Sequence, residues 1–399
     1  MRISIAASRR ARVGGIVSAV LLMTMAVGVI VVARSDRSDR SEPVSIPPPR
    51  VHVAPNVRVI VGETAAVPIA VEGSDDTPTV QVERPVDVTV RADALEFRAT
   101  APGTRTATIT VTGPGGTTTA RVNVRARHVP HPDLVVGAGD SIASGHGLER
   151  RDYLGQDACW RDFDDAYPRV VADALDATVA IVACSGARAT SLATAPVPSE
   201  RIGALISDPQ DRSQLDWIAA ANPGVVVMTA GANDLGFTEP ADLFDGDALH
   251  HDTLDQRLDR INTAVSDAVT RILDETDARV VITGYHNPTA IEPVGIDGCA
   301  GRCFRANVDT VMSRLHATLR EAVRSSDDGR VTFADPGPLF IGHEASTGLP
   351  LGGLRATTPY CAASGLPWDG DPWVNQVDCV HPNATGARAY ADAVVRALR

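Results

Sequence analysis

Ser141 is a candidate nucleophile within the stretch GAGDSIASGHG, residues 137–147, which directly follows the apolar run 134–136. A serine hydroxyl can attack an ester carbonyl once a nearby base accepts its proton. Glycine, aspartate and serine are also common in turns for purely local backbone reasons. The choice between a nucleophile and a turn residue therefore depends on partners elsewhere in the chain.

Three later segments contain the partners that such a nucleophile needs: Gly186 in ACSGARA, Asn233 in TAGANDLGF and His381 in DCVHPNATG. Histidine titrates near neutral pH and suits the role of general base. Asp378, three residues before His381, could orient the imidazole and stabilise the imidazolium. The backbone N–H groups of Ser141 and Gly186 and the side-chain amide of Asn233 could donate to the oxyanion of a tetrahedral intermediate. Each segment alone is common, but their joint presence and order favour acyl transfer.

Apolar runs alternate with segments of helical periodicity from Leu134 onward. The runs expected to form buried strands are residues 134–140, 179–186, 224–231, 279–285 and 330–336, and the longest helical pattern covers 254–275. This alternation predicts an α/β domain in which helices cover both faces of a parallel sheet. Sites in open sheets of this kind lie at the carboxyl ends of the strands, which is where Ser141 would be.

These four segments resemble the SGNH, or GDSL-type, hydrolase family, and the resemblance covers residues 134–399. The family blocks are named for Ser, Gly, Asn and His, and correspond here to Ser141, Gly186, Asn233 and His381, while Asp378 of DCVH matches the third triad member. The resemblance implies an SGNH-hydrolase-like, flavodoxin-like fold and a serine carboxylic ester hydrolase with no cofactor and no metal. Some relatives replace the aspartate by a backbone carbonyl. The turn lacks the second glycine of G-x-S-x-G, which disfavours an α/β-hydrolase.

The chain contains six cysteines, and an even number in an exported chain is typical of disulfides. They are Cys159, Cys184, Cys299, Cys303, Cys361 and Cys379. Spacing alone selects none of about 15 possible connectivities. A zinc site is the weaker alternative, because CAGRC is the only close pair. Similarity to secreted actinobacterial lipases and esterases with three disulfides implies the pairs 159–184, 299–303 and 361–379.

Residues 1–34 place arginines before an uncharged run, 13–33, that is long enough to span a bilayer. We expect a signal anchor, with a cleaved signal peptide as the alternative. Both place the remaining chain outside the cytoplasm, either on the cell membrane or secreted. Residues 35–50 are rich in serine, proline and charge, and are expected to form a disordered linker.

Residues 51–127 alternate apolar and polar side chains in short, valine- and threonine-rich runs separated by glycine-containing turns. This pattern predicts a small immunoglobulin-like β-sandwich. It carries no cluster of residues suited to chemistry, so a spacer role is the simplest interpretation. A second linker, 128–133, would lead into the hydrolase domain, 134–399.

The net charge of -12 argues against nucleic acid as a partner, and the absence of lysine excludes a Schiff-base mechanism. We expect a monomer that hydrolyses small-molecule, lipid or acylated-glycan esters, with short and medium acyl chains accepted without interfacial activation because no lid-like apolar insertion is evident. A polysaccharide or cell-wall O-acetyl esterase and a non-catalytic surface-binding protein are the alternatives. The segments YHNP, 285–288, and GHE, 342–344, could line the cleft or cap helices.

Overall fold

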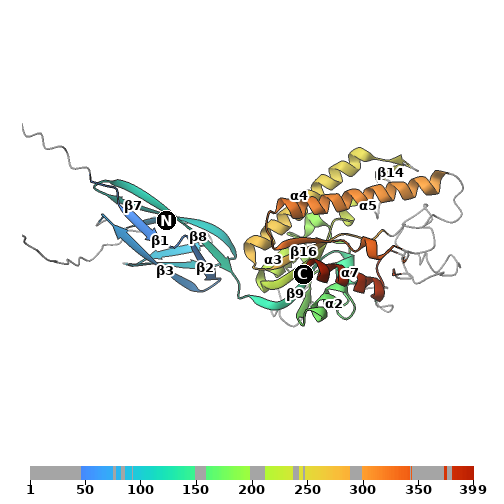
Figure 1. Cartoon of the computed structure of the whole chain (residues 1–399), viewed down its shortest axis with the longest axis horizontal. Helices are drawn as coiled ribbons and strands as arrows, with labels where there is room; N and C mark the ends of the chain where they lie inside the picture. Colours follow the sequence, from blue (N-terminus) through green and yellow to red (C-terminus); the bar gives the residue numbers. More distant parts are fainter. Residues whose placement is uncertain are drawn as a thin grey trace, which may run out of the picture. The chain divides into compact units, whose positions relative to one another are not determined.

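The computed structural model describes residues 46–399 with several gaps. These are 75–77, 82–85, 92, 149–158, 198–211, 237–241, 246–247, 288–298, 342, 344–372 and 375–379. Two compact units make up the chain, one of residues up to Thr100 with Arg105–Arg125 and the other of Ala101–Thr104 with Ala126–Arg399 (Figure 1). The predicted anchor and most of the first predicted linker lie outside the described residues.

The first unit consists of two four-stranded sheets. In order across each sheet, the strands are β1 (Arg50–Val53), β3 (Thr64–Glu72), β6 (Ala94–Ala99) and β5 (Val86–Val90), then β2 (Asn56–Ile60), β8 (Gly116–Arg127), β7 (Gly103–Gly113) and β4 (Thr79–Gln81). Alternate side chains of β6, Leu95, Phe97 and Ala99, are fully buried. The predicted N-terminal strands are therefore present, while the immunoglobulin-like assignment stays a prediction. β1 and β4, of four and three residues, are too short to display a clear alternation in the sequence.

The second unit is built on a parallel sheet of five strands with the order β10-β9-β13-β16-β17. Their bounds are β9 (His131–Gly139), β10 (Thr178–Ile181), β13 (Pro223–Thr229), β16 (Arg279–Thr283) and β17 (Val331–Ala334). Numbered by position in this sheet the order is 2-1-3-4-5, the flavodoxin-like arrangement. The predicted α/β fold with a parallel sheet is confirmed.

Helices cover the sheet on both faces, with α4 and α5 packed together on one face and α2 and α7 on the other (Figure 1). The helices are α1 (Ser141–Ser144), α2 (Tyr167–Ala174), α3 (Gln214–Ala221), α4 (His251–Glu275), α5 (Cys299–Ser325) and α7 (Ala384–Ala397). Short elements complete the unit: η1 (Ala189–Ser191), η3 (Asn233–Leu235), η5 (Gly337–Leu339), β11 (Pro196–Val197), β12 (Arg212–Ser213), β14 (Phe244–Asp245) and β15 (Ala248–Leu249). Leu254, Leu258, Ile261 and Val265 of α4 share one buried face, as the helical spacing predicts.

Two strand ends differ from the prediction by three or more residues. β9 begins at His131 rather than Leu134, because its N–H donates to the carbonyl of Asn222 and it pairs with Pro223. β10 ends at Ile181 rather than near Gly186, because Val182 and Ala183 both donate to the carbonyl of Gly137 and the ladder stops there. Within the part of the chain that the structure describes, no helix is both long and apolar enough to cross a membrane.

Candidate active site

Ser141 and His381 meet at the carboxyl end of β9. Ser141 is the first residue of α1, and Asp140 caps this helix by accepting the Ile142 N–H at 3.0 Å. His381 precedes α7, and its Nε2 lies 2.7 Å from the Ser141 Oγ. The pair is 240 residues apart in sequence. An imidazole nitrogen at this distance can accept the proton of the hydroxyl.

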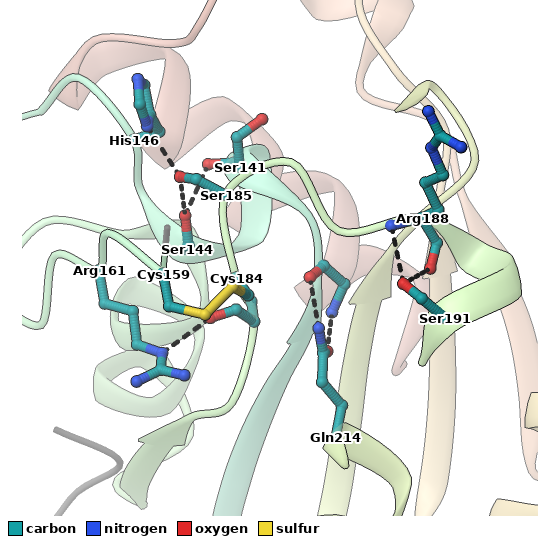
Figure 2. The surroundings of a disulfide bond; sticks show 12 residues. Ser141, Ser144, His146, Cys159, Arg161, Cys184, Ser185, Arg188, Ser191 and Gln214 are labelled. Carbon is teal, nitrogen blue, oxygen red and sulfur yellow. Dashed lines mark hydrogen bonds between the residues drawn. A yellow bond between two sulfur atoms is a disulfide. The ribbon is translucent and has the colours of Figure 1, made fainter. Parts of the chain in front are cut away.

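Gly139 allows the chain to turn from β9 into α1. Its φ is +110°, and a Cβ at this position would lie 1.8 Å from the carbonyl oxygen of Thr229. The buried side-chain amide of Gln214 binds Gly139 on both sides, accepting its N–H at 2.7 Å and donating to its carbonyl at 2.9 Å (Figure 2). Only glycine satisfies these backbone constraints, so the small residues before Ser141 have a structural cause.

Gly186 lies in the loop after β10, with a φ of +78°. A Cβ built there meets no atom within 4 Å, so within this chain the glycine is required by its left-handed backbone rather than by close approach to a neighbour. A disulfide joins Cys184 to Cys159 beside it, and the Arg161 Nε donates to the Ala183 carbonyl at 2.8 Å (Figure 2). These contacts tie the Gly186 loop to the segment before α2.

The Cys159–Cys184 bond is the first of the three pairs that the resemblance implied. Cys361 and Cys379 lie outside the described residues, and only the backbone of Cys299 and Cys303 is described, as the first turns of α5. Asp378 also lies outside the described residues. Its place as third triad member therefore stays a prediction, as do the other two disulfides.

Asn233 begins η3, in the turn that follows β13, and contacts the Gly186 loop. Its Nδ2 donates to the carbonyl of Ala187 at 2.9 Å. The next residue, Asp234, accepts three hydrogen bonds from the same loop: from the Ala189 N–H at 2.7 Å, the Thr190 N–H at 3.2 Å and the Thr190 hydroxyl at 2.9 Å. Hydrogen bonds thus join the segments that contain Gly186 and Asn233, two of the three predicted oxyanion donors.

His146 is a second histidine beside His381, and the sequence interpretation assigned it no role. Its Nδ1 lies 2.8 Å from the Ser185 Oγ, and its ring centroid lies 4.6 Å from that of His381. The Ser144 Oγ lies 3.3 Å from the Ser185 Oγ. The available signal was its position five residues after Ser141 in the same glycine-rich turn. Figure 2 shows this group linking α1 to the Gly186 loop.

Asp140 is a buried carboxyl group next to Ser141, with 1% of its surface exposed. Its Oδ2 accepts the hydroxyl hydrogen of Tyr285 at 2.6 Å. Burial raises the pKa of Asp140 to about 6, although the hydrogen bonds from Tyr285 and Ile142 and the nearby His381 act to lower it. An acidic group therefore titrates near neutral pH in the turn that presents Ser141.

The family is decided by the match of residues 138–389 to the model of the GDSL-like lipase/acylhydrolase family. The chain belongs to this family. The predicted family and the predicted class, a serine ester hydrolase, are thereby confirmed, and the matched range contains Ser141, Gly186, Asn233 and His381. No curated protein sequence matches this GDSL-like hydrolase.

Several solved structures are similar to the GDSL-like hydrolase at low identity. An extracellular lipase of Streptomyces rimosus is 20% identical, with 66% of this chain and 99% of that chain covered and a TM-score of 0.42. A phospholipase A1 of Streptomyces albidoflavus is 21% identical, with 67% and 99% covered and a TM-score of 0.43. A family two carbohydrate esterase of Clostridium thermocellum is 15% identical, with 76% and 69% covered and a TM-score of 0.35.

Proposed function

We propose that this GDSL-like hydrolase cleaves carboxylic esters outside the cytoplasm through an acyl-serine intermediate on Ser141. The observation that supports this most directly is the 2.7 Å distance between the Ser141 Oγ and the His381 Nε2. A serine needs such a base to act as a nucleophile at neutral pH. Family membership supplies the reaction class, and this contact together with the motif supports Ser141 as the nucleophile.

In the proposed acylation step, the Ser141 Oγ attacks the ester carbonyl carbon while the His381 Nε2 takes its proton. The tetrahedral oxyanion accepts hydrogen bonds from the backbone N–H groups of Ser141 and Gly186 and from one side-chain N–H of Asn233. The side-chain nitrogen of Asn233 carries two hydrogens. One is donated to the Ala187 carbonyl, so the second would donate the hydrogen bond to the oxyanion. The imidazolium then protonates the alkoxide as the C–O bond breaks, and the alcohol leaves.

In the proposed deacylation step, water attacks the acyl-serine with His381 as base, and the carboxylic acid is released as the Ser141 hydroxyl reforms. Asp378 would hold the imidazole orientation in both steps. Neither step consumes a cofactor. The bond changes balance as hydrolysis of one ester by one water molecule.

An extracytoplasmic location is supported by the arginine-led apolar run in residues 1–34 and by the Cys159–Cys184 disulfide, since such bonds persist in oxidising compartments. The apolar run would act as a membrane anchor or a signal peptide. For the substrate we propose soluble esters of short and medium acyl chains. Acetyl esters of polysaccharides are the second substrate class to be tested.

Labelling with a fluorophosphonate probe tests the nucleophile. We expect the wild type to be labelled on Ser141, as located by peptide mapping, and Ser141→Ala to be unlabelled. Rates on p-nitrophenyl esters from acetate to palmitate, beside acetylated xylan and triolein, test the substrate class. Full hydrolysis by Ser141→Ala would overturn the mechanism, and activity confined to xylan or a sharp rise on triolein emulsions would overturn the substrate proposal.

A further inference from the structure

We propose that Tyr285 and His286, which follow β16, are positioning residues that hold three site segments of this unit at fixed positions relative to one another. The three site segments are residues 140–141, 232–233 and 380–381, which contain Ser141, Asn233 and His381. This inference rests on the proposed function, because it concerns how the proposed nucleophile, oxyanion donor and base are held together. Tyr285 and His286 are not assigned to contact the reacting atoms.

The Tyr285 hydroxyl joins the first two site segments. It donates to the Asp140 Oδ2 at 2.6 Å and accepts the N–H of Ala232 at 3.1 Å. Asp140 directly precedes Ser141, and Ala232 directly precedes Asn233. Tyr285 is 5% exposed, so both bonds are shielded from water. One buried oxygen therefore sets the distance between the turn of the nucleophile and the turn of the oxyanion donor.

His286 supports the third site segment. Its Nε2 lies 2.8 Å from the carbonyl oxygen of Val380, which directly precedes His381. A carbonyl oxygen can only accept, so the Nε2 carries the hydrogen of this bond. The Nδ1 lies 2.9 Å from the Tyr390 hydroxyl, which also accepts the backbone N–H of His286 at 3.1 Å. The ring stacks on Phe340 at 4.3 Å.

These bonds define the tautomer and the orientation of His286. With the hydrogen on Nε2, the neutral ring accepts the hydroxyl hydrogen of Tyr390 on Nδ1, so both nitrogens are used. The side chain is 4% exposed and cannot exchange these partners for water without a local rearrangement. The backbone that leads into His381 is therefore anchored to the end of β16.

The arrangement predicts an effect on turnover rather than on substrate affinity. Proton transfer and attack require the reacting atoms to be within hydrogen-bond or near-attack distance, and a misplacement of about 1 Å can cost about 100-fold in rate. Loss of the Tyr285 hydroxyl frees the Ser141 turn from the Asn233 turn while Ser141, Asn233 and His381 themselves are retained. A lower kcat with little change in KM is the signature of this loss.

Tyr285→Phe and its matched control Tyr167→Phe test the first connection. Tyr167 is also buried, at 1% exposed, and its hydroxyl bonds the Thr229 Oγ1 of β13 at 2.9 Å rather than a site segment. Both variants lose one buried hydroxyl, and Tm should decrease more in Tyr285→Phe because that hydroxyl bonds both a buried carboxyl group and a backbone N–H. On p-nitrophenyl butyrate we expect kcat to fall about 10- to 100-fold in Tyr285→Phe, with KM within about 3-fold, and kcat of Tyr167→Phe to stay within about 3-fold.

His286→Gln and His286→Leu test the second connection independently, including the case in which Tyr285→Phe does not fold. The glutamine amide nitrogen can replace the Nε2 donor to the Val380 carbonyl, whereas leucine cannot. We expect His286→Gln to retain at least about a third of the wild-type kcat and His286→Leu to lose about 10- to 100-fold. The rate of phosphonylation of Ser141 by the fluorophosphonate probe should fall in parallel, which separates acylation from product release.

The outcomes distinguish this inference from the proposed function. If Ser141→Ala retained hydrolysis, the proposed function would fail and the inference with it. If Ser141→Ala is inactive but Tyr285→Phe equals Tyr167→Phe and His286→Leu equals His286→Gln in kcat, the inference alone is wrong. A rise in KM with unchanged kcat would assign these residues to substrate binding and would also overturn it.

Discussion

The two units of this chain bury different kinds of side chain. In the antiparallel unit, β3 alternates buried and exposed positions, whereas in the parallel unit β9 is buried continuously over residues 134–139. Among the described residues, every buried polar or charged side chain lies at Arg127 or beyond, and Asp140, Ser144, Gln214 and His286 are among them. The described core of the first unit is apolar, whereas the second unit also buries polar side chains, which must be desolvated on folding.

Burial of polar groups in the second unit requires that hydrogen bonds offset its free-energy cost. A buried polar group costs free energy unless it is hydrogen-bonded, and a buried charge costs more. Asp140, Thr229, Thr283 and His286 lie at the carboxyl ends of β9, β13 and β16, as do Ser141 and Asn233, whereas the buried Arg127, Asn222 and Thr276 precede these strands. The following predictions test whether hydrolysis depends on the groups at the carboxyl ends of these strands.

Ser141→Ala and His381→Ala should have the largest effects. Each removes one partner of the 2.7 Å contact, and we expect kcat on p-nitrophenyl butyrate to fall about 10⁴-fold or more. Because the two groups act as a unit, the double variant should be little worse than either single variant. Circular dichroism and Tm should remain close to those of the wild type. A decrease below about 10-fold in Ser141→Ala would contradict the assignment of the nucleophile.

Asn233→Ala should have the next largest effect. If its amide donates to the oxyanion, its removal should lower kcat by about 100- to 1000-fold with a small change in KM. Asp234→Ala serves as a comparison, because it removes the bonds to Ala189 and Thr190 without removing the amide. Steady-state kinetics on one ester measures both. Equal losses in the two variants would assign the role of Asn233 to loop structure instead.

Replacement of both Cys159 and Cys184 by serine should mainly reduce stability. The two cysteines are 25 residues apart, and removal of a cross-link of this length costs about 3 to 4 kcal/mol in the chain-entropy account. Denaturant unfolding measures this loss. We expect hydrolysis at 25 °C to fall only a few-fold, since the Gly186 loop retains its bonds to Asn233 and Asp234. An unchanged free energy of unfolding would contradict this prediction.

Asp140→Asn should change how stability depends on pH. Burial raises the pKa of Asp140 from its ordinary value of 3.8 to about 6, so the folded state holds this proton more tightly than the unfolded state. The wild type should therefore lose stability as pH rises from about 4 to about 6, by at most about 3 kcal/mol relative to Asp140→Asn. Urea unfolding of both proteins from pH 4 to pH 8 measures the difference. A difference independent of pH would contradict the raised pKa.

Phe97→Ala should have no effect on hydrolysis. Phe97 is fully buried in the first unit, and its truncation should cost that unit about 3 to 5 kcal/mol. Calorimetry should show a lower Tm for this unit, while kcat and KM measured below that transition should match the wild type. If hydrolysis decreased in proportion to unfolding of the first unit, the proposal that hydrolysis depends on the second unit alone would be wrong.

The sequence was most informative where burial is simplest. Buried parallel strands read as continuous apolar runs, so β13 and β17 were predicted to within two residues at each end. Strands of three or four residues, such as β4 and β1, show too little alternation to be recognised. The motifs identified Ser141 and His381 as candidate site residues. Their 2.7 Å contact could not be predicted from the sequence, because it depends on how the fold brings together two segments 240 residues apart.

The supporting groups were harder to predict for a physical reason. Tyr285 contacts Asp140 across 145 residues, and His286 contacts Val380 across 94, so no local pattern marks either bond. The segment YHNP was noticed, but its first two residues are buried supports rather than exposed caps. Gly186 was identified from its motif as a backbone donor to the oxyanion, and the structure shows that its positive φ is the constraint within the chain.

Gln214 connects the turn that presents Ser141 to α3, a helix that is distant from this turn in sequence. Pairing of β9 with β10 ends at Gly137, and the Gln214 side chain bonds the backbone of Gly139 beyond that point. The position of Gly139 therefore depends on the position of α3. Insertion of one residue within α3, directly after Gln214, would rotate Gln214 by about 100° relative to the rest of the helix. An engineer who grafts this turn onto another scaffold must therefore transplant the first turn of α3 with it.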